Sequence, residues 1–240
     1  MKHDGPDPLT PPAAPSGAAV VFGARMPLAE AFAAELADTG VSHGLIGPRE
    51  VPRLWDRHLL NCAVIEDSFP AQARVVDVGS GAGLPGLSRA GARPVLDVHL
   101  VEPMLRRTTW LAGVVDRLGL DGVTVHRGRA EELAGRLAAP WVTARAVAPL
   151  EKLARWCVPL LGPGGTLVAM KGRSAEEVLA EAREALERLG LSTAVVTTHG
   201  EGVVDEPVLT VDLVFDGAAS EGGDGRRRRG SGRRTRRGRG

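Results

Sequence analysis

The chain has 240 residues, of which 43% are hydrophobic and 25% are charged, and its formal net charge is +1. A chain of this length and composition can bury one sizeable core, so one globular domain with tails is expected. Cys62 and Cys157 lie far apart and neither belongs to a C-x-x-C pair, which excludes a disulfide framework and a zinc cluster and fits a reducing cytoplasm. The N-terminus lacks a signal-peptide segment, and no uncharged apolar run approaches the roughly 20 residues of a membrane span, so we expect a soluble protein.

The two ends of the chain differ in composition from its body. The last twenty residues contain nine arginines and two acids, which leaves 21 basic and 27 acidic residues, a net charge of −6, in residues 1–220. Segment 218–240 consists largely of Gly, Ser and Arg with few apolar residues, and the N-terminal segment 1–22 is rich in Pro and polar residues, so we expect both to be disordered. Arginine blocks of this kind commonly bind nucleic-acid phosphates, although a terminus that only improves solubility fits equally well.

The intervening segment, 23–217, is predicted to form a single α/β domain. Two amphipathic stretches, 25–38 and 50–65, predict a helical cap within residues 24–66. Five short apolar runs follow as candidate strands, at 74–80, 95–102, 123–128, 141–147 and 165–172. Helical patterns separate them; one ends at Gly119, and another begins at Ser174 and ends at Gly190.

This alternation of strands and helices is typical of βαβ units around a parallel sheet. The last two strand-like runs, 191–200 and 207–215, have only a short polar loop between them and should form an antiparallel pair. The expected fold is therefore Rossmann-like, with a mostly parallel seven-stranded sheet that ends in an antiparallel pair.

The first candidate strand runs directly into a glycine-rich turn, VVDVGSGAGLPG. A turn of this kind lets the backbone approach a ligand closely, and the following helix offers free N–H donors. No lysine follows the glycines, so a mononucleotide P-loop is disfavoured. A dinucleotide fingerprint is formally present at Gly81, Gly83 and Gly86, with Glu102 about twenty residues further on.

Two residues argue against a dinucleotide. Asp77 at the strand end would repel a pyrophosphate but attract an ammonium group, and Pro85 removes one N–H from the turn. S-adenosylmethionine, an amino acid joined to a nucleoside, suits the turn better. Its methionyl end would meet a D-x-G-x-G-x-G turn, and an acid at the end of the second strand would bind the ribose. The matching residues are Asp77, Gly79, Gly81, Gly83 and Glu102.

Several motifs together give a more specific resemblance. Residues 44–215 resemble the RsmG (GidB) family of small-subunit ribosomal RNA guanine-N7 methyltransferases. The resemblance lies in the glycine turn and in the motifs VEPMLRRTTWL, GRAEEL, TARAVAPL and MKG, together with LWDRHLLNCAVI upstream. The resemblance implies a class I S-adenosylmethionine-dependent methyltransferase fold and a guanine in the decoding-region loop of 16S rRNA as acceptor. By matching position it implies cofactor contacts at Gly79, Leu84, Ala130, Glu131 and Arg145, with Ala130 and Glu131 beside the adenine.

The implied chemistry demands little of the side chains. Guanine N7 carries a lone pair and no proton, so it can attack a sulfonium methyl without a general base. The candidates for positioning the substrate are Arg145, Lys171 and His58. Lys171 follows an apolar strand and could bind RNA phosphate or guanine O6. His58 could equally be a residue packed in the core. No metal is expected, and the protein should be a monomer that binds 16S rRNA or the small ribosomal subunit.

Three other functions remain open from the sequence, one of which is a dinucleotide-dependent oxidoreductase that uses the glycine turn for its cofactor. The chain could be a class I methyltransferase that acts on another RNA or on a small molecule. It could also be a non-catalytic RNA-binding protein that has kept the fold.

Overall fold

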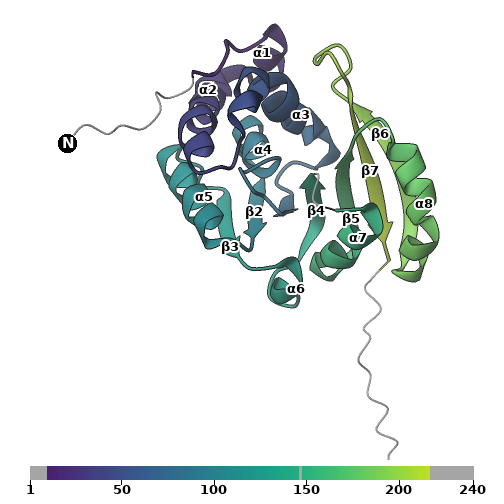
Figure 1. Ribbon diagram of the computed structural model, residues 1–240. Coiled ribbons are helices and arrows are strands. Elements are labelled where there is room, and N and C mark those ends of the chain that lie inside the picture. Colours follow the sequence, from purple (N-terminus) through teal and green to yellow (C-terminus); the bar gives the residue numbers. More distant parts are fainter. Residues whose placement is uncertain (1–9, 146–147, 217–240) are drawn as a thin grey trace, which may run out of the picture.

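The structure is a computed structural model that describes residues 10–145 and 148–216. A central sheet separates two layers of helices (Figure 1). The strands are β1 (Arg74–Val78), β2 (Asp97–Glu102), β3 (Val123–Arg127), β4 (Ala139–Arg145), β5 (Leu161–Lys171), β6 (Leu191–His199) and β7 (Val208–Phe215). The helices are α1 (Ser16–Phe22), α2 (Met26–Glu35), α3 (Leu60–Ala63), α4 (Gly86–Ala92), α5 (Leu105–Arg117), α6 (Ala130–Leu133), α7 (Leu150–Cys157) and α8 (Ala175–Arg188).

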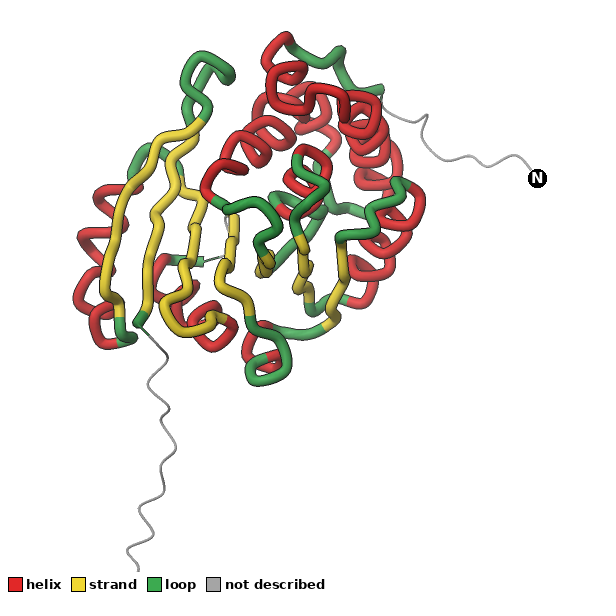
Figure 2. The backbone as a smooth tube through the Cα atoms, turned by 180° about the vertical axis from the view of Figure 1, so that it is seen from behind, coloured by secondary structure: helices red, strands yellow, loops and turns green. Residues whose placement is uncertain are grey.

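The seven strands form one sheet in the order β3-β2-β1-β4-β5-β7-β6. Strands β1 to β5 are parallel, whereas β7 pairs in the antiparallel sense with both β5 and β6. The sheet and its terminal antiparallel pair, seen from behind in Figure 2, confirm the predicted fold class. The strand order reverses direction between β1 and β4, and ligands of open α/β sheets bind at such a switch point.

Two hydrophobic cores lie on opposite faces of the sheet. The cap, α4 and α5 cover one face, where Val75, Val98 and Leu100 point toward them. Helices α6, α7 and α8 cover the other face, with Val76, Val78 and Val142 among the buried strand residues. This alternation of neighbouring side chains between the two faces is what strands buried on both sides require.

The N-terminal cap is built from short, irregular helical pieces rather than two regular helices. After α2 the chain continues through a π-helical turn, Leu36–Gly40. The second stretch consists of 3₁₀ turns at Pro48–Arg53 and Val64–Ser68, a π-helical turn at Leu54–Leu59, and α3. Pro52 inside the second stretch has no N–H to donate, which favours such a break.

The expected disorder over 1–22 is wrong for Ser16–Phe22, which forms α1. Ala18 and Phe22 on this helix are buried in the core, so the segment has enough apolar surface to pack. Residues 1–9, the tail from 217 onward and residues 146–147 at the end of the fourth predicted strand lie outside the described residues.

Ser174 directly precedes α8, and its side chain makes no capping hydrogen bond to this helix. Gly119 and Gly190 do adopt left-handed φ values of +59° and +90° directly after α5 and α8.

One continuous helical run, Ser16–Gly40, is 25 residues long and contains an 18-residue window with a mean hydropathy of 1.2, which by length and composition is enough to cross a membrane. A core helix of a globular domain passes the same test, so this is weak evidence for a membrane span. Here Phe22, Phe32 and Leu36 are buried in the core that the cap shares with the sheet.

Candidate functional site

The glycine-rich turn joins β1 to α4 at the carboxyl edge of the sheet. Gly79, Gly81 and Gly83 have φ values of +74°, +54° and +80°, a region that side chains with a Cβ rarely adopt. A Cβ on Gly83 would lie 2.4 Å from Cδ1 of Leu87, so this glycine is needed for packing. A Cβ on Gly81 would have only the Gly79 carbonyl oxygen near it, at 3.8 Å, so this part of the loop borders open space.

Glu102 at the end of β2 holds the turn in place. Its carboxylate accepts hydrogen bonds from the Gly81 N–H at 3.1 Å and from the Met104 N–H at 3.0 Å. The Arg107 guanidinium lies 3.5 Å from the same carboxylate. Because the Glu102 side chain is only 2% exposed, its observed role is to fix the loop, and its predicted contact with a ribose stays a prediction.

Asp77 lies behind the glycine turn, and its predicted contact with a cofactor ammonium group stays a prediction. Its side chain is fully buried on the α4 side of the sheet, and one carboxylate oxygen accepts a hydrogen bond from the Gly86 N–H at 3.0 Å. It points inward because Asp77 shares a strand face with Val75, which packs beneath the cap and α4. The structure therefore assigns Asp77 to holding the start of α4, behind the loop.

A second buried charge lies near Asp77. Arg89 on α4 is fully buried with its guanidinium 4.2 Å from the centre of the Phe69 ring. Burial raises the pKa of Asp77 to about 6, with the positive charge of Arg89 opposing the rise, and burial lowers the pKa of Arg89 to about 10.

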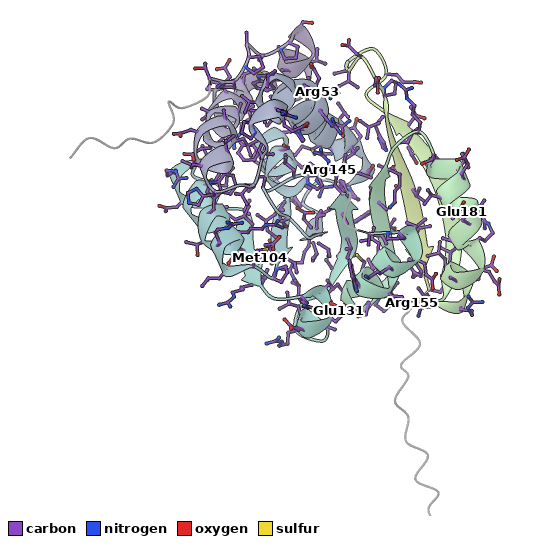
Figure 3. All side chains as sticks on the ribbon, in the orientation of Figure 1. Arg53, Met104, Glu131, Arg145, Arg155 and Glu181 are labelled. Carbon is purple, nitrogen blue, oxygen red and sulfur yellow. The ribbon has the colours of Figure 1, made fainter. Side chains whose placement is uncertain are left out.

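A cavity of about 390 Å³ opens beside the glycine turn. It is lined by residues that follow the ends of three neighbouring strands and by part of α7, among them Gly79, Pro103, Ala130, Glu131, Lys152 and Trp156. Met104 and Glu131 are labelled in Figure 3 near this part of the molecule. Ala130 and Glu131 were predicted from the sequence, whereas Leu84 is buried and does not line the cavity.

Helix α7 contributes a wall that sequence reasoning missed. The Lys152 ammonium lies 5.1 Å from the centre of the Trp156 ring, and both side chains border the cavity. No motif in the sequence points to α7, because its residues join the cavity only through the folding of the chain.

Arg145 at the end of β4 is fixed by the cap. One guanidinium nitrogen donates to Nδ1 of His58 at 2.8 Å, and another donates to Sγ of Cys62 at 2.9 Å. The other ring nitrogen of His58 lies 2.9 Å from the Glu50 carboxylate. Arg145 can only donate, so His58 must be neutral with its proton on Nε2, directed at Glu50.

The electrostatics of His58 agree with this assignment. Burial, followed by the charge of Arg145, lowers the pKa of His58, while the hydrogen bond to Glu50 opposes the shift. The hydrogen bond from His58 in turn lowers the pKa of Glu50. His58 is therefore a packed residue that holds Arg145, and Glu50 is a partner that the sequence did not reveal.

A second cavity, of about 660 Å³, lies between the cap, the ends of β4 and β5 and the loop between β6 and β7. Four cationic side chains line it, Arg53, Arg57, Arg145 and Lys171. Lys171 donates to the Ala148 carbonyl oxygen at 3.1 Å, and its burial lowers its pKa. Figure 3 shows Arg53 on the cap above Arg145.

The two cavities lie at neighbouring positions on one edge of the sheet. Asp77 of β1 is in register with Thr143 of β4, so Gly79 and Arg145, each two residues further on, are adjacent at the carboxyl ends of these strands. Gly79 lines the smaller cavity and Arg145 lines the larger one. Within residues 10–145 and 148–216, no group of three His, Cys, Asp or Glu side chains is placed to hold a metal ion.

Comparison with known proteins identifies close relatives. A family model described as rRNA small subunit methyltransferase G matches residues 25–206. Two proteins named ribosomal RNA small subunit methyltransferase G are each 54% identical to this chain. The match to the protein from Thermobifida fusca covers 90% of this chain and 91% of the relative, and the match to the protein from Streptomyces avermitilis covers 88% of this chain and 89% of the relative.

Solved structures share the fold at low sequence identity. Mitomycin 7-O-methyltransferase MmcR is 18% identical with a TM-score of 0.54, covering 76% of this chain and 62% of that one. The S-adenosylmethionine-dependent methyltransferase SibL is 17% identical with a TM-score of 0.53, covering 65% and 55%.

Proposed function

The chain belongs to the rRNA small subunit methyltransferase G family, and we propose that it transfers a methyl group from S-adenosylmethionine to N7 of a guanine in the decoding-region loop of 16S rRNA. One observation carries the proposal beyond family membership. Two cavities lie side by side at the switch point of the sheet, one against the glycine turn and one lined by cations, and Arg145 stands at their boundary.

The smaller cavity has the features that a nucleoside joined to an amino acid requires. Its volume lies within the range of small-molecule sites, and it combines a glycine-rich turn with apolar walls. Gly79, Ala130 and Glu131 border it directly, while Gly81, Gly83 and Leu84 belong to the turn. In this proposal Pro103, Ala130 and Trp156 surround the adenine, and Glu102 positions the turn from behind.

S-adenosylmethionine supplies, when bound, a methyl group activated by a positively charged sulfur. The protein has to orient the acceptor and exclude water, because guanine N7 has no proton to remove. Arg145 is suited to orientation, since the two hydrogen bonds that its guanidinium donates to the cap residues His58 and Cys62 restrict it. Lys171, restrained at Ala148, offers a second cation on the next strand for phosphate or guanine O6.

The proposed substrate is 16S rRNA or the small ribosomal subunit, which implies a cytoplasmic location. We expect the protein to act as a monomer, since one chain supplies both cavities; light scattering on the purified protein would test this.

The function can be tested with methyl-labelled S-adenosylmethionine and small-subunit particles that lack the modification. After nuclease digestion, mass spectrometry of the nucleosides should find labelled 7-methylguanosine in one rRNA fragment. A different labelled nucleoside would discard N7 of guanine as the acceptor. Cofactor binding without any label would favour another substrate or a binding role.

A further inference from the structure

The larger cavity carries an inference about how the substrate enters, and this inference rests on the proposed function. Enzymes that do chemistry on a nucleobase commonly turn its nucleotide out of the surrounding structure and into a pocket. The cavity of about 660 Å³ lies within the size range of ligand sites and borders Arg145 at the boundary with the smaller cavity.

The cations of this cavity are not equally available. Arg145 is engaged by His58 and Cys62, and Lys171 by the Ala148 carbonyl. Arg57 lies 3.6 Å from the Glu50 carboxylate. In contrast, Arg53 is exposed, and within the described part of the chain it has neither an ion pair nor a side-chain hydrogen bond.

The cavity is also lined by acidic side chains, which would not be expected in a groove that binds only the RNA backbone. Asp56, next to the cap cations, and Asp205 and Glu206 on the loop between β6 and β7 line the same space. Carboxylates repel phosphates, but they accept hydrogen bonds from the N–H groups on the Watson–Crick edge of guanine. Asp56 and Asp205 are exposed, and Glu206 forms an ion pair with Arg173 at 2.8 Å. A hollow lined by both cations and acids therefore fits a whole nucleotide, whose phosphate and base would meet different groups.

We propose that this cavity receives the acceptor nucleotide in an everted conformation and that Arg53 binds the phosphate on its 5′ side. The phosphate would meet the one cation of the cavity that the described residues leave unengaged. Arg145 and Lys171 lie deeper, at the strand ends, where the base must meet the methyl donor.

The test removes each partner of this contact separately and then together. The 16S rRNA is assembled by splinted ligation with either a normal phosphate or an uncharged methylphosphonate 5′ of the target guanosine, and it is reconstituted into small-subunit particles. The kcat/KM for methylation is measured for the natural protein and for Arg53→Gln on both substrates. Arg49→Gln is the matched control, because Arg49 is an exposed arginine on the same 3₁₀ turn that does not line the cavity.

We expect Arg53→Gln to lower kcat/KM about tenfold on the normal substrate, as the loss of one charge-assisted contact implies, and Arg53→Lys to recover part of it. The methylphosphonate should lower the natural protein's kcat/KM to a similar extent, and Arg53→Gln should cause no further loss on it. Cofactor affinity and unfolding midpoint should match those of Arg49→Gln.

The assignment of Arg53 would be overturned if the losses of kcat/KM caused by Arg53→Gln and by the methylphosphonate multiplied when the two changes were combined. It would also be overturned if Arg53→Gln were as active as the control, and in both cases the methyltransferase function would remain intact. Failure of the natural protein to methylate the normal particle would instead contradict the proposed function itself.

Discussion

Replacing His58 tests whether the cap sets the position of Arg145. In the natural protein the Arg145 guanidinium donates to His58 at 2.8 Å and to Cys62 at 2.9 Å. His58→Ala removes the nitrogen acceptor and leaves the sulfur, which is a weak acceptor. Glu50 loses its hydrogen-bond partner at the same time.

The size of the effect follows from the kind of hydrogen bond that is lost. Hydrogen bonds to charged groups contribute about 1.5–3 kcal/mol. Arg145 is half-buried and regains part of this from water, so we expect the lower end of the range. At about 1.4 kcal/mol per factor of ten, kcat/KM for methylation should fall about tenfold.

The assay compares His58→Ala with His58→Gln over a range of pH. A glutamine carbonyl can accept from Arg145 while its amide donates to Glu50, so His58→Gln should keep most of the activity. Burial, Arg145 and Arg57 lower the pKa of His58 from its ordinary value of 6.5, and Glu50 opposes this. The hydrogen bond that needs neutral His58 is therefore fully present above pH 6.5 and is lost as the pH falls through the lower folded-state pKa.

The natural protein should accordingly lose activity on the acid side, and His58→Gln should not show that loss. Equal activity of His58→Ala and the natural protein would refute the reasoning. So would an acid limb that persists unchanged in His58→Gln, because some other group would then be responsible for it.

Three further changes test the loop, the buried charges and the tail. Gly81→Val should abolish S-adenosylmethionine binding in calorimetry while the protein stays folded, because the side chain would project into the open side of the loop at a φ of +54°; unchanged affinity would contradict the cofactor assignment. Asp77→Asn should lower the free energy of unfolding in urea by about 3–5 kcal/mol, because it leaves Arg89 as an uncompensated buried charge. Asp77→Asn combined with Arg89→Met should recover part of that loss, and simple addition of the two effects would argue against their coupling. Deletion of residues 221–240, which carry nine arginines, should weaken RNA affinity and flatten its salt dependence, and equal affinities at low salt would exclude a role for the tail.

The sheet could be predicted from the sequence because its signals are local. Each parallel strand is a short apolar run, and the glycines after α5 and α8 mark where those helices end. The structure of the cap was harder to predict, since Pro52 and the π-helical turns break the regular spacing of apolar residues that predicts a helix. Helix α1 was missed because Ala18 and Phe22 are too few to stand out among the prolines that precede them.

Positions in the candidate site could be predicted where a single sequence motif contains both the residue and the feature that requires it. The left-handed glycines of the turn belong to this group, as does the acid that ends β2. Contacts between distant segments were not predictable. Glu50 meets His58, and His58 meets Arg145 across 87 positions of sequence, through interactions that no spacing rule encodes.

Asp77 shows that a motif can be located from the sequence while the contacts of its side chains cannot. An acid at the end of the first strand was expected to face the ligand, but the alternation of side chains along β1 directs it toward α4 instead. There it binds the Gly86 N–H, and Gly86 must remain glycine because a Cβ would lie 2.7 Å from that carboxylate and 2.3 Å from Leu100. The acid thus acts on the cofactor turn through the helix that follows it. Burial raises the pKa of Asp77 and the charge of Arg89 opposes that rise, so the charge state of an acid that holds the turn depends on a residue that lies outside the motif.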